Sequence, residues 1–227
     1  MVINLYLKNF LIKYFNFFYI FHNLFIKNKI FINREYYSHS QEDKFVLSKF
    51  GKKKGFYVDV GCHHPTRLNN CHLLYKNGWR GINIDLNKIS IDLFNYVRKD
   101  DTNINIAVSL NKKKVTYYYD KPLSLYNSLI KKNYLKYSSI IQSDSLDNII
   151  KKTKFKNKEI DFLSVDAEGK DLDVLKSLNF KKYNPKSICV EIWKGRDKNK
   201  IYDFLIKNNY QLAWKRRENF IFLKKGN

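Results

Sequence analysis

The chain has 227 residues, with 43 Lys and Arg against 21 Asp and Glu, and a formal charge of +22. This length fits one α/β domain with an additional segment better than two full domains. The three cysteines, Cys62, Cys71 and Cys189, are odd in number and lack a CxxC spacing. They argue against a disulfide framework and a structural zinc site, and they favour a reducing cytosol.

The positive charge by itself would suggest an anionic partner such as nucleic acid or acidic lipid. However, the charged residues are spread along the whole chain, which is typical of a solvated basic surface. The chain is also crowded with Ile, Asn, Phe and Tyr, whose codons are A/T-rich, so genomic base composition explains part of the lysine excess. Charge alone therefore does not define a nucleic-acid-binding protein.

Residues 3–33 are dense in aromatic and aliphatic side chains and carry several lysines. The uncharged run at 14–26 is too short to span a bilayer, and no small-residue cleavage site follows it, so a signal peptide is not expected. We expect residues 1–36 to form a helical segment and residues 37–227 to form the main domain. The helical segment either lies in a membrane interface, with its lysines near anionic lipid, or packs on the domain or on a second subunit.

A short helix at 40–50, capped by Ser40 with Asp43 three residues later, is expected to lead into the main domain. From residue 56 onward, strand-like and helix-like segments alternate, which predicts parallel strands joined by right-handed helical crossovers. The expected strands lie at 56–60, 81–85, 103–109, 160–165 and 187–192, and the expected helices at 67–77, 88–97, 145–151, 170–178 and 198–208.

Three further segments complete the predicted domain. Residues 113–120 form an additional strand, and 122–137 form an irregular insertion over the site. Two extended pieces, 210–214 and 219–224, flank the charged turn KRRE and predict an antiparallel edge of the sheet. The predicted fold class is therefore α/β, with a doubly wound, mostly parallel sheet and an antiparallel last strand.

Ligands of open α/β sheets bind beyond the carboxyl ends of the strands. Gly61 ends the first strand and allows a close approach to the backbone, and Asp85 ends the second strand 24 positions later. That spacing is close to the one at which an acidic residue binds the ribose hydroxyls of an adenine nucleoside. The alternatives are a plain turn for Gly61 and a helix N-cap for Asp85. Because the loop lacks GxGxxG, a nucleoside without a pyrophosphate fits it better.

The segment DFLSVDAEGKDLDVLKSL at 161–178 places two carboxylates where another buried strand ends. Asp166 ends the strand and Glu168 follows two positions later, whereas Asp171 and Asp173 are interpreted as partners of the helix dipole. Neighbouring like charges raise the pKa of a carboxyl group, so this pair is suited to general-base chemistry.

Several blocks of the sequence together resemble the FkbM-like family of S-adenosylmethionine-dependent methyltransferases, over roughly residues 37–224. They are residues 41–43, FYVDVGCHHP, NGWRGINID, NINIAVS, residues 127–128 and, with most weight, SVDAEGKDLDVLKSL. The resemblance implies a class I, Rossmann-like methyltransferase fold. It also implies O-methylation, which in this family often acts on sugars or natural products.

The resemblance further implies where the cofactor S-adenosylmethionine would lie. Asp59 and Gly61 would position its methionine part, Asp85 its ribose, and the stretch from Asp101 to Ile106 its adenine. In methyltransferases with this sheet, the end of the fourth strand faces the transferred methyl, which would place Asp166 and Glu168 near the acceptor. Gln41 and Asp43 would either close over the cofactor or belong to the N-terminal cap of the predicted helix at 40–50.

We therefore predict that Asp166 is the general base or orients the acceptor, with Glu168 supporting it. A divalent metal held by Asp166, Glu168 and Glu191 is an alternative, because it would lower the pKa of the hydroxyl. Glu191 would instead pair with Lys194 or Arg196 if it holds no metal.

Other residues of the predicted site have two interpretations each. His63 and His64 either transfer protons or shape the loop, with the second favoured, and Cys62 is interpreted as a packing residue. The tyrosines of the insertion suit either stacking on sugar rings or a packed lid. Trp79 and Trp193 are interpreted as core or rim residues.

Three functional hypotheses follow. In the first, the protein methylates a hydroxyl of a sugar, glycan or glycolipid, in the cytoplasm or at the inner membrane face, with peripheral membrane contact through residues 3–33. In the second, the charge of +22 reflects an RNA methyltransferase, whose binding would weaken steeply with salt. In the third, the domain is a non-catalytic module and the N-terminal segment recruits membranes or partners.

Overall fold

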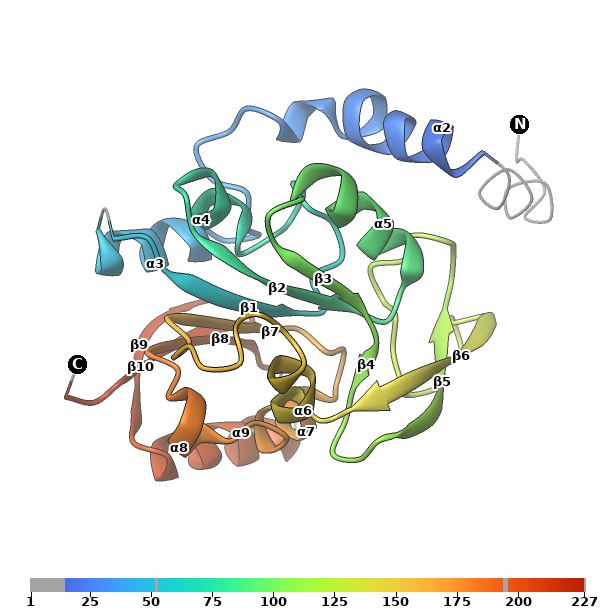
Figure 1. The fold of residues 1–227 in the computed structure, drawn as a ribbon. Coiled ribbons are helices and arrows are strands. Elements are labelled where there is room, and N and C mark those ends of the chain that lie inside the picture. Colours follow the sequence, from blue (N-terminus) through green and yellow to red (C-terminus); the bar gives the residue numbers. More distant parts are fainter. Residues whose placement is uncertain (1–14, 52, 194–195, 227) are drawn as a thin grey trace. The chain divides into compact units, whose positions relative to one another are not determined.

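A computed structural model of the chain describes residues 15–51, 53–193 and 196–226 (Figure 1). The chain divides into two units after Glu35, and each is described by itself. In the first unit, helix α2 (Asn16–Phe21) continues into a π-helical turn, η1 (His22–Lys27), and a 3-10 turn, η2 (Lys29–Phe31). No helix within the described ranges has both the length and the apolar character needed to cross a bilayer.

The second unit is built on a seven-stranded sheet in the order β3-β2-β1-β7-β8-β10-β9. The first five strands pair in parallel, and β10 is antiparallel to both β8 and β9. This arrangement confirms the predicted doubly wound sheet with an antiparallel last strand. In chain order the strands are β1 (Phe56–Val60), β2 (Arg80–Asp85), β3 (Thr102–Asn105), β7 (Phe162–Val165), β8 (Ser187–Glu191), β9 (Tyr210–Arg216) and β10 (Asn219–Lys224).

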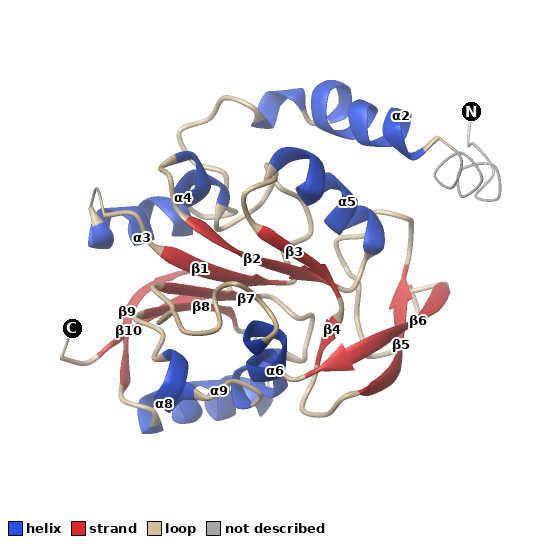
Figure 2. Cartoon of the chain, viewed as in Figure 1, coloured by secondary structure: helices blue, strands red, loops and turns tan. Residues whose placement is uncertain are grey.

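Helices cover both faces of this sheet (Figure 2). One face carries α3 (Glu42–Phe50), α4 (His72–Lys76) and α5 (Lys88–Val97), and the other carries α6 (Leu146–Lys151), α7 (Asp171–Lys176), α8 (Phe180–Tyr183) and α9 (Arg196–Lys207). Successive strand residues point to opposite faces. Val58 of β1 therefore packs in the core beneath α6, α7 and α9, whereas Tyr57 packs in the core beneath α3 and α4.

A small second sheet in the order β4-β6-β5 lies beside the main one. The predicted strand 103–109 breaks at Ile106, whose N–H donates to the Asp85 carbonyl at 3.2 Å. Its second part is β4 (Ala107–Val108), which pairs with β6 (Tyr137–Asp144), and β5 (Lys113–Tyr119) pairs antiparallel with β6. Strand β6 was not predicted, because its sequence YSSIIQSD is polar and lacks apolar alternation.

The start of α3 differs from the prediction. Gln41, not Ser40, occupies the N-cap position, with a left-handed φ of 75° and no side-chain capping bond. The Ser40 N–H donates to Glu42 Oε2 at 2.6 Å. The Asp43 carboxylate accepts a hydrogen bond from the Tyr37 N–H at 2.6 Å. It therefore fixes the segment before the helix and does not form a capping box.

Gly61 lies where three strands converge. Its N–H donates to the Ile84 carbonyl of β2 at 2.9 Å, and the Asp166 N–H following β7 donates to the Val60 carbonyl at 3.0 Å. Gly61 has φ +77°, and a Cβ there would collide with the backbone carbonyl oxygen of Asp166. The glycine is therefore required by the neighbouring strand, independently of any ligand.

We expect Gly61→Ala to lower the free energy of unfolding by about 3 kcal/mol or more, because left-handed strain adds to a backbone collision. Gly51 is the matched control, since it has φ +59° with no atom near a built Cβ. Gly51→Ala should then carry backbone strain without a collision, and it should lower the free energy of unfolding by less than Gly61→Ala does. Equal losses for the two variants in urea denaturation would contradict this account of Gly61.

Candidate active site

A cavity of about 320 Å³ lies at the carboxyl ends of β1, β2, β7 and β8. It is lined at these four strand ends by Gly61, Asp85, Asp166 and Glu191. Its volume falls within the range of small-molecule sites, roughly 300–1,000 Å³. The remaining wall includes His39, His63, Ile106, Ala107, Leu125, Tyr126, Asn127, Leu129, Glu168, Lys170, Trp193, Glu218 and Asn219.

Asp85 joins two loops at the cavity. Its Oδ1 accepts the Asn87 N–H at 2.7 Å, and its Oδ2 accepts the His63 N–H at 2.8 Å. Asn87, whose Oδ1 accepts the Ile89 N–H at 2.9 Å, is the N-cap of α5, so the capping alternative for Asp85 was wrong. Burial raises the pKa of Asp85 to about 6. Because a carboxylate oxygen accepts two hydrogen bonds, each oxygen retains capacity for a ligand hydroxyl.

The loop after Gly61 is shaped by its histidines. His64 Nδ1 accepts the Thr66 N–H at 3.2 Å and the Arg67 N–H at 3.1 Å, and the side chain is buried. This agrees with the loop-shaping interpretation for His64. His63 differs, because it has φ +50° and lines the cavity beside Asp85.

Asp59 supports this loop from below rather than lining the cavity. Its Oδ2 accepts from Asn69 Nδ2 at 2.9 Å, and the same Asn69 amide donates to the Cys62 carbonyl at 3.1 Å. Burial raises the pKa of Asp59, and the nearby Arg98 guanidinium opposes that shift. Asp59 is thus linked to the loop through Asn69.

Arg98 connects the loop to the middle of the sheet. It is fully buried, and it donates to the Pro65 carbonyl and to Asn69 Oδ1, both at 2.6 Å. It also donates to the Tyr57 hydroxyl and to Asn83 Oδ1, both at 3.2 Å. One guanidinium therefore fixes the loop against strands β1 and β2.

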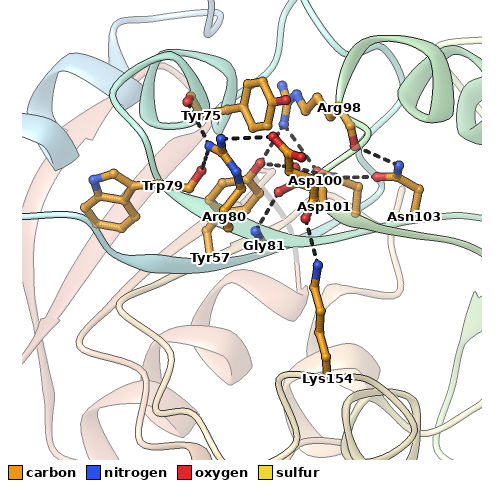
Figure 3. Close-up of polar contacts among 11 residues, drawn as sticks. Tyr57, Tyr75, Trp79, Arg80, Gly81, Arg98, Asp100, Asp101, Asn103 and Lys154 are labelled. Carbon is orange, nitrogen blue, oxygen red and sulfur yellow. Dashed lines mark hydrogen bonds and ion pairs between the residues drawn. The ribbon is translucent and has the colours of Figure 1, made fainter.

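Asp101 belongs to the same network (Figure 3), and it is not among the residues that line the cavity. Its carboxylate accepts hydrogen bonds from the Tyr57 hydroxyl, from Asn83 Nδ2 and from the Gly81 N–H. It precedes β3 and lies beside the beginning of β2, whereas the cavity is at the other end of these strands. The structure therefore does not support the predicted contact of Asp101 with adenine, and Ile106 and Ala107 line the cavity on that side.

Gln41 also lies outside the cavity wall, at the start of α3, whereas His39 two residues earlier lines it. Of the predicted site residues, the structure brings together Gly61, Asp85, Asp166, Glu168 and Glu191. It does not bring Asp59, Asp101 and Gln41 into the wall.

Asp166 lies at the centre of an acidic group. Its side chain is exposed to the cavity, and desolvation by the surrounding protein raises the pKa of its carboxyl group well above the ordinary value. The charges of Glu191, Asp171 and Glu168 raise it further, in that order. Burial likewise raises the pKa of Glu191, whose Oε2 accepts from Trp193 Nε1 at 2.8 Å.

Asp171 does more than face the positive end of a helix. Its Oδ1 accepts the Ala167 N–H at 2.8 Å and its Oδ2 the Gly169 N–H at 3.2 Å, so it holds the turn that carries Glu168. Burial raises the pKa of Asp171 to about 6. Glu168 has φ +49° and forms an ion pair with Lys132 Nζ at 3.1 Å.

The metal alternative gains no support from the geometry. Within the described ranges, no group of three or more His, Cys, Asp and Glu side chains is arranged to hold a metal ion. The two ion-pair partners predicted for Glu191 were Lys194 and Arg196. Lys194 and the side chain of Arg196 lie outside the described residues.

The segment between β5 and β6 forms one wall of the cavity and is fixed at several points. Asn87 Nδ2 donates to the Pro122 carbonyl at 2.7 Å, and the Ser128 hydroxyl donates to the Glu168 carbonyl at 3.1 Å. Ser128 also exchanges backbone hydrogen bonds with Tyr118 of β5. The role of Asn87 was not predicted, and its only sequence signal is its position two residues after Asp85.

The sheet order, the antiparallel last strand and the cavity beyond the parallel strand ends are those of the class I methyltransferase fold. The sequence matches the Methyltransferase FkbM domain family over residues 59–212. The chain therefore belongs to the FkbM methyltransferase family, as the sequence blocks predicted.

One solved structure agrees on the fold, and a second shows a weaker similarity. The O-methyltransferase from Bacillus cereus in complex with SAH has a TM-score of 0.50 and 9% identity, covering 89% of this chain and 88% of that one. A TehB-like SAM-dependent methyltransferase from Corynebacterium glutamicum has a TM-score of 0.46 and 11% identity, covering 92% and 97%. At 9% identity, the similarity to the Bacillus cereus enzyme shows a shared fold alone. No curated protein gives a significant match to the sequence.

If Asp85 accepts the ribose hydroxyls, Asp85→Asn should weaken binding of S-adenosylhomocysteine at least tenfold, about 1.4 kcal/mol, because hydrogen bonds to a charged acceptor are lost. Isothermal titration calorimetry measures this directly. Asp92→Asn is the control, since Asp92 pairs with Lys88 on α5 and does not line the cavity. An affinity for Asp85→Asn equal to that of the control would refute the ribose assignment.

Proposed function

We propose that the protein transfers a methyl group from S-adenosylmethionine to a hydroxyl of a sugar, glycan or glycolipid. The observation that carries the proposal is the position of Asp166, which ends β7 inside the cavity with Glu168 and Glu191 beside it. A hydroxyl is a poor nucleophile until a base removes its proton, and a carboxylate with a raised pKa is a better base than an ordinary one.

The wall of the cavity suits this cofactor. Five carboxylate residues line it, namely Asp85, Asp166, Glu168, Glu191 and Glu218. When bound, S-adenosylmethionine supplies an electrophilic methyl group on a positively charged sulfur, and it also carries an ammonium group. Carboxylates stabilise such cations, while the free lone pairs of Asp85 suit the ribose hydroxyls.

In this proposal each part of the wall has its own task. Asp85 fixes the nucleoside end, and Asp166 accepts the proton of the acceptor hydroxyl. Glu168, which pairs with Lys132 and lies next to the turn at Gly169, would accept a hydrogen bond from a second hydroxyl of the acceptor. Alignment of the reacting groups contributes roughly 7–11 kcal/mol to such a transfer, so fixed walls matter as much as the base.

The rim of the cavity supports a sugar-like acceptor. Trp193 is 62% exposed and Tyr126 is 46% exposed, and both line the cavity. Tyr126 packs edge-on against Tyr134, with 6.0 Å between the ring centroids. Flat aromatic side chains next to carboxylates suit a ring that has an apolar face and hydroxyls at its edge.

The same wall disfavours an RNA acceptor. Its five carboxylate residues stand against a single Lys or Arg, Lys170, among the described lining residues. Such a wall would repel a phosphate backbone near the reacting group, whereas a neutral hydroxyl compound meets no such repulsion.

Asp166→Asn should reduce methyl transfer about 10²–10⁴-fold, because the amide cannot accept the proton. Binding of S-adenosylhomocysteine should change by only a few-fold. Transfer to a sugar with free hydroxyls is measured as S-adenosylhomocysteine release, with Asp92→Asn again as control, because Asp92 pairs with Lys88 and neither residue lines the cavity. Full activity of Asp166→Asn would remove Asp166 from the mechanism.

The rate should fall on the acid side as pH decreases through the raised pKa of Asp166, because protonation removes the base. Glu191→Gln removes the charge that, after burial, raises this pKa most. The acid limb of its pH–rate profile should therefore move to lower pH. Glu159→Gln, at an exposed position outside the cavity wall, should leave the limb in place. A shift to higher pH, or none, in Glu191→Gln would contradict the coupling.

A further inference from the structure

Exposed apolar side chains are concentrated in the first unit. Of the eighteen large hydrophobic residues that are exposed among the described residues, eight lie between Phe15 and Ile32. They are Phe15, Phe17, Phe18, Phe21, Phe25, Ile26, Ile30 and Ile32, and Ile30 is 72% exposed. Exposed apolar residues scattered singly are normal, but a group of this kind marks an interaction surface.

The phenylalanines of this group are on one side of the helical segment. Counted from Phe17, the other three phenylalanines follow one, four and eight positions later, at Phe18, Phe21 and Phe25. This spacing keeps them close to one face of a helix. Ring contacts agree with the spacing, because the centroids of Phe17 and Phe18 are 6.0 Å apart and those of Phe21 and Phe25 are 5.1 Å apart. We name these four residues the phenylalanine face.

The charge of the segment has a single sign. Residues 1–34 contain Lys8, Lys13, Lys27, Lys29 and Arg34, and the first acidic residue of the chain is Glu35. The rest of the chain mixes acids and bases. The first unit, which ends at Glu35, therefore combines exposed aromatic rings with five basic residues against one acidic residue.

We propose that the phenylalanine face and the neighbouring cations dock the enzyme on an anionic bilayer surface. Aromatic rings enter the boundary between headgroups and acyl chains, and lysines near an anionic surface contribute about 1 kcal/mol each. The contact is peripheral, because no helix in the described ranges has the length and apolar character of a bilayer crossing. The inference does not depend on the identity of the methyl acceptor.

Charge argues against the other occupants of this surface. A second copy of the chain would bring two purely cationic segments together in a symmetric contact, which like charges oppose. A single-stranded nucleic acid would use aromatic rings within a basic groove, whereas the phenylalanine face is a convex helical surface. An anionic bilayer satisfies both the rings and the charges.

The test is flotation of the full-length protein with vesicles of phosphatidylcholine alone or in an equal mixture with phosphatidylglycerol. We expect the protein to float with the anionic vesicles and not with the neutral ones, and to be released by high salt. The double variant Phe17→Ser/Phe18→Ser should bind anionic vesicles at least tenfold more weakly. Lys29→Gln should also weaken binding, by a smaller factor.

Matched controls separate this surface from general stickiness and charge. Leu110→Ser/Ile140→Ser removes two exposed apolar residues of the second unit, 49% and 71% exposed, and should bind like the unmodified chain. Lys156→Gln, at an exposed position of the second unit, should do the same. Unchanged binding of S-adenosylhomocysteine by each variant shows that the methyltransferase domain is intact, so a failure here is distinct from a failure of the proposed reaction.

Three outcomes would overturn the proposal. The first is equal flotation with neutral and anionic vesicles, and the second is full binding by Phe17→Ser/Phe18→Ser. The third is a dimer in solution that this double variant abolishes, because a second copy would then be the occupant of the surface.

Discussion

The close approach of β1 to β7 at Gly61 is the constraint on which the cavity depends. The Asp166 carbonyl occupies the space that any side chain at residue 61 would need, and the Asp166 N–H bonds to β1 just before it. This contact brings the ends of β1, β2 and β7 to a common edge. The loop after Gly61 and the acidic turn after β7 then face each other across the cavity. Neither segment can move away from the other unless strands β1 and β7 separate.

The chain is strongly basic, but most of the charged side chains that line its cavity are carboxylates. The formal charge is +22, yet five carboxylate residues line the cavity with one lysine. Such a local concentration of negative charge is destabilising by itself, since burial and repulsion between carboxylates raise the pKa of Asp85, Asp166 and Glu191. A cationic ligand would relieve that repulsion.

Strand ends could be predicted from the sequence because burial and periodicity define where a strand stops. That is why Gly61, Asp85 and Asp166 were placed correctly at one edge. The expected contact of Asp101 with the adenine finds no support in the structure, since the sequence does not show that this carboxylate turns back to Tyr57 and Gly81. Strand β6 was not predicted because its sequence is polar and lacks the apolar alternation of a half-buried strand. Its position is defined instead by its pairing with β5.

Arg98 has a consequence for any attempt to transplant this binding loop. The loop is held from behind by a guanidinium that does not line the cavity, together with Asn69 on the loop and Asn83 in the sheet. A graft of the loop residues alone would leave their anchor in the donor protein. The portable module is therefore discontinuous in sequence, and relatives that exchange Arg98 for another residue should have replaced its buried acceptors as well.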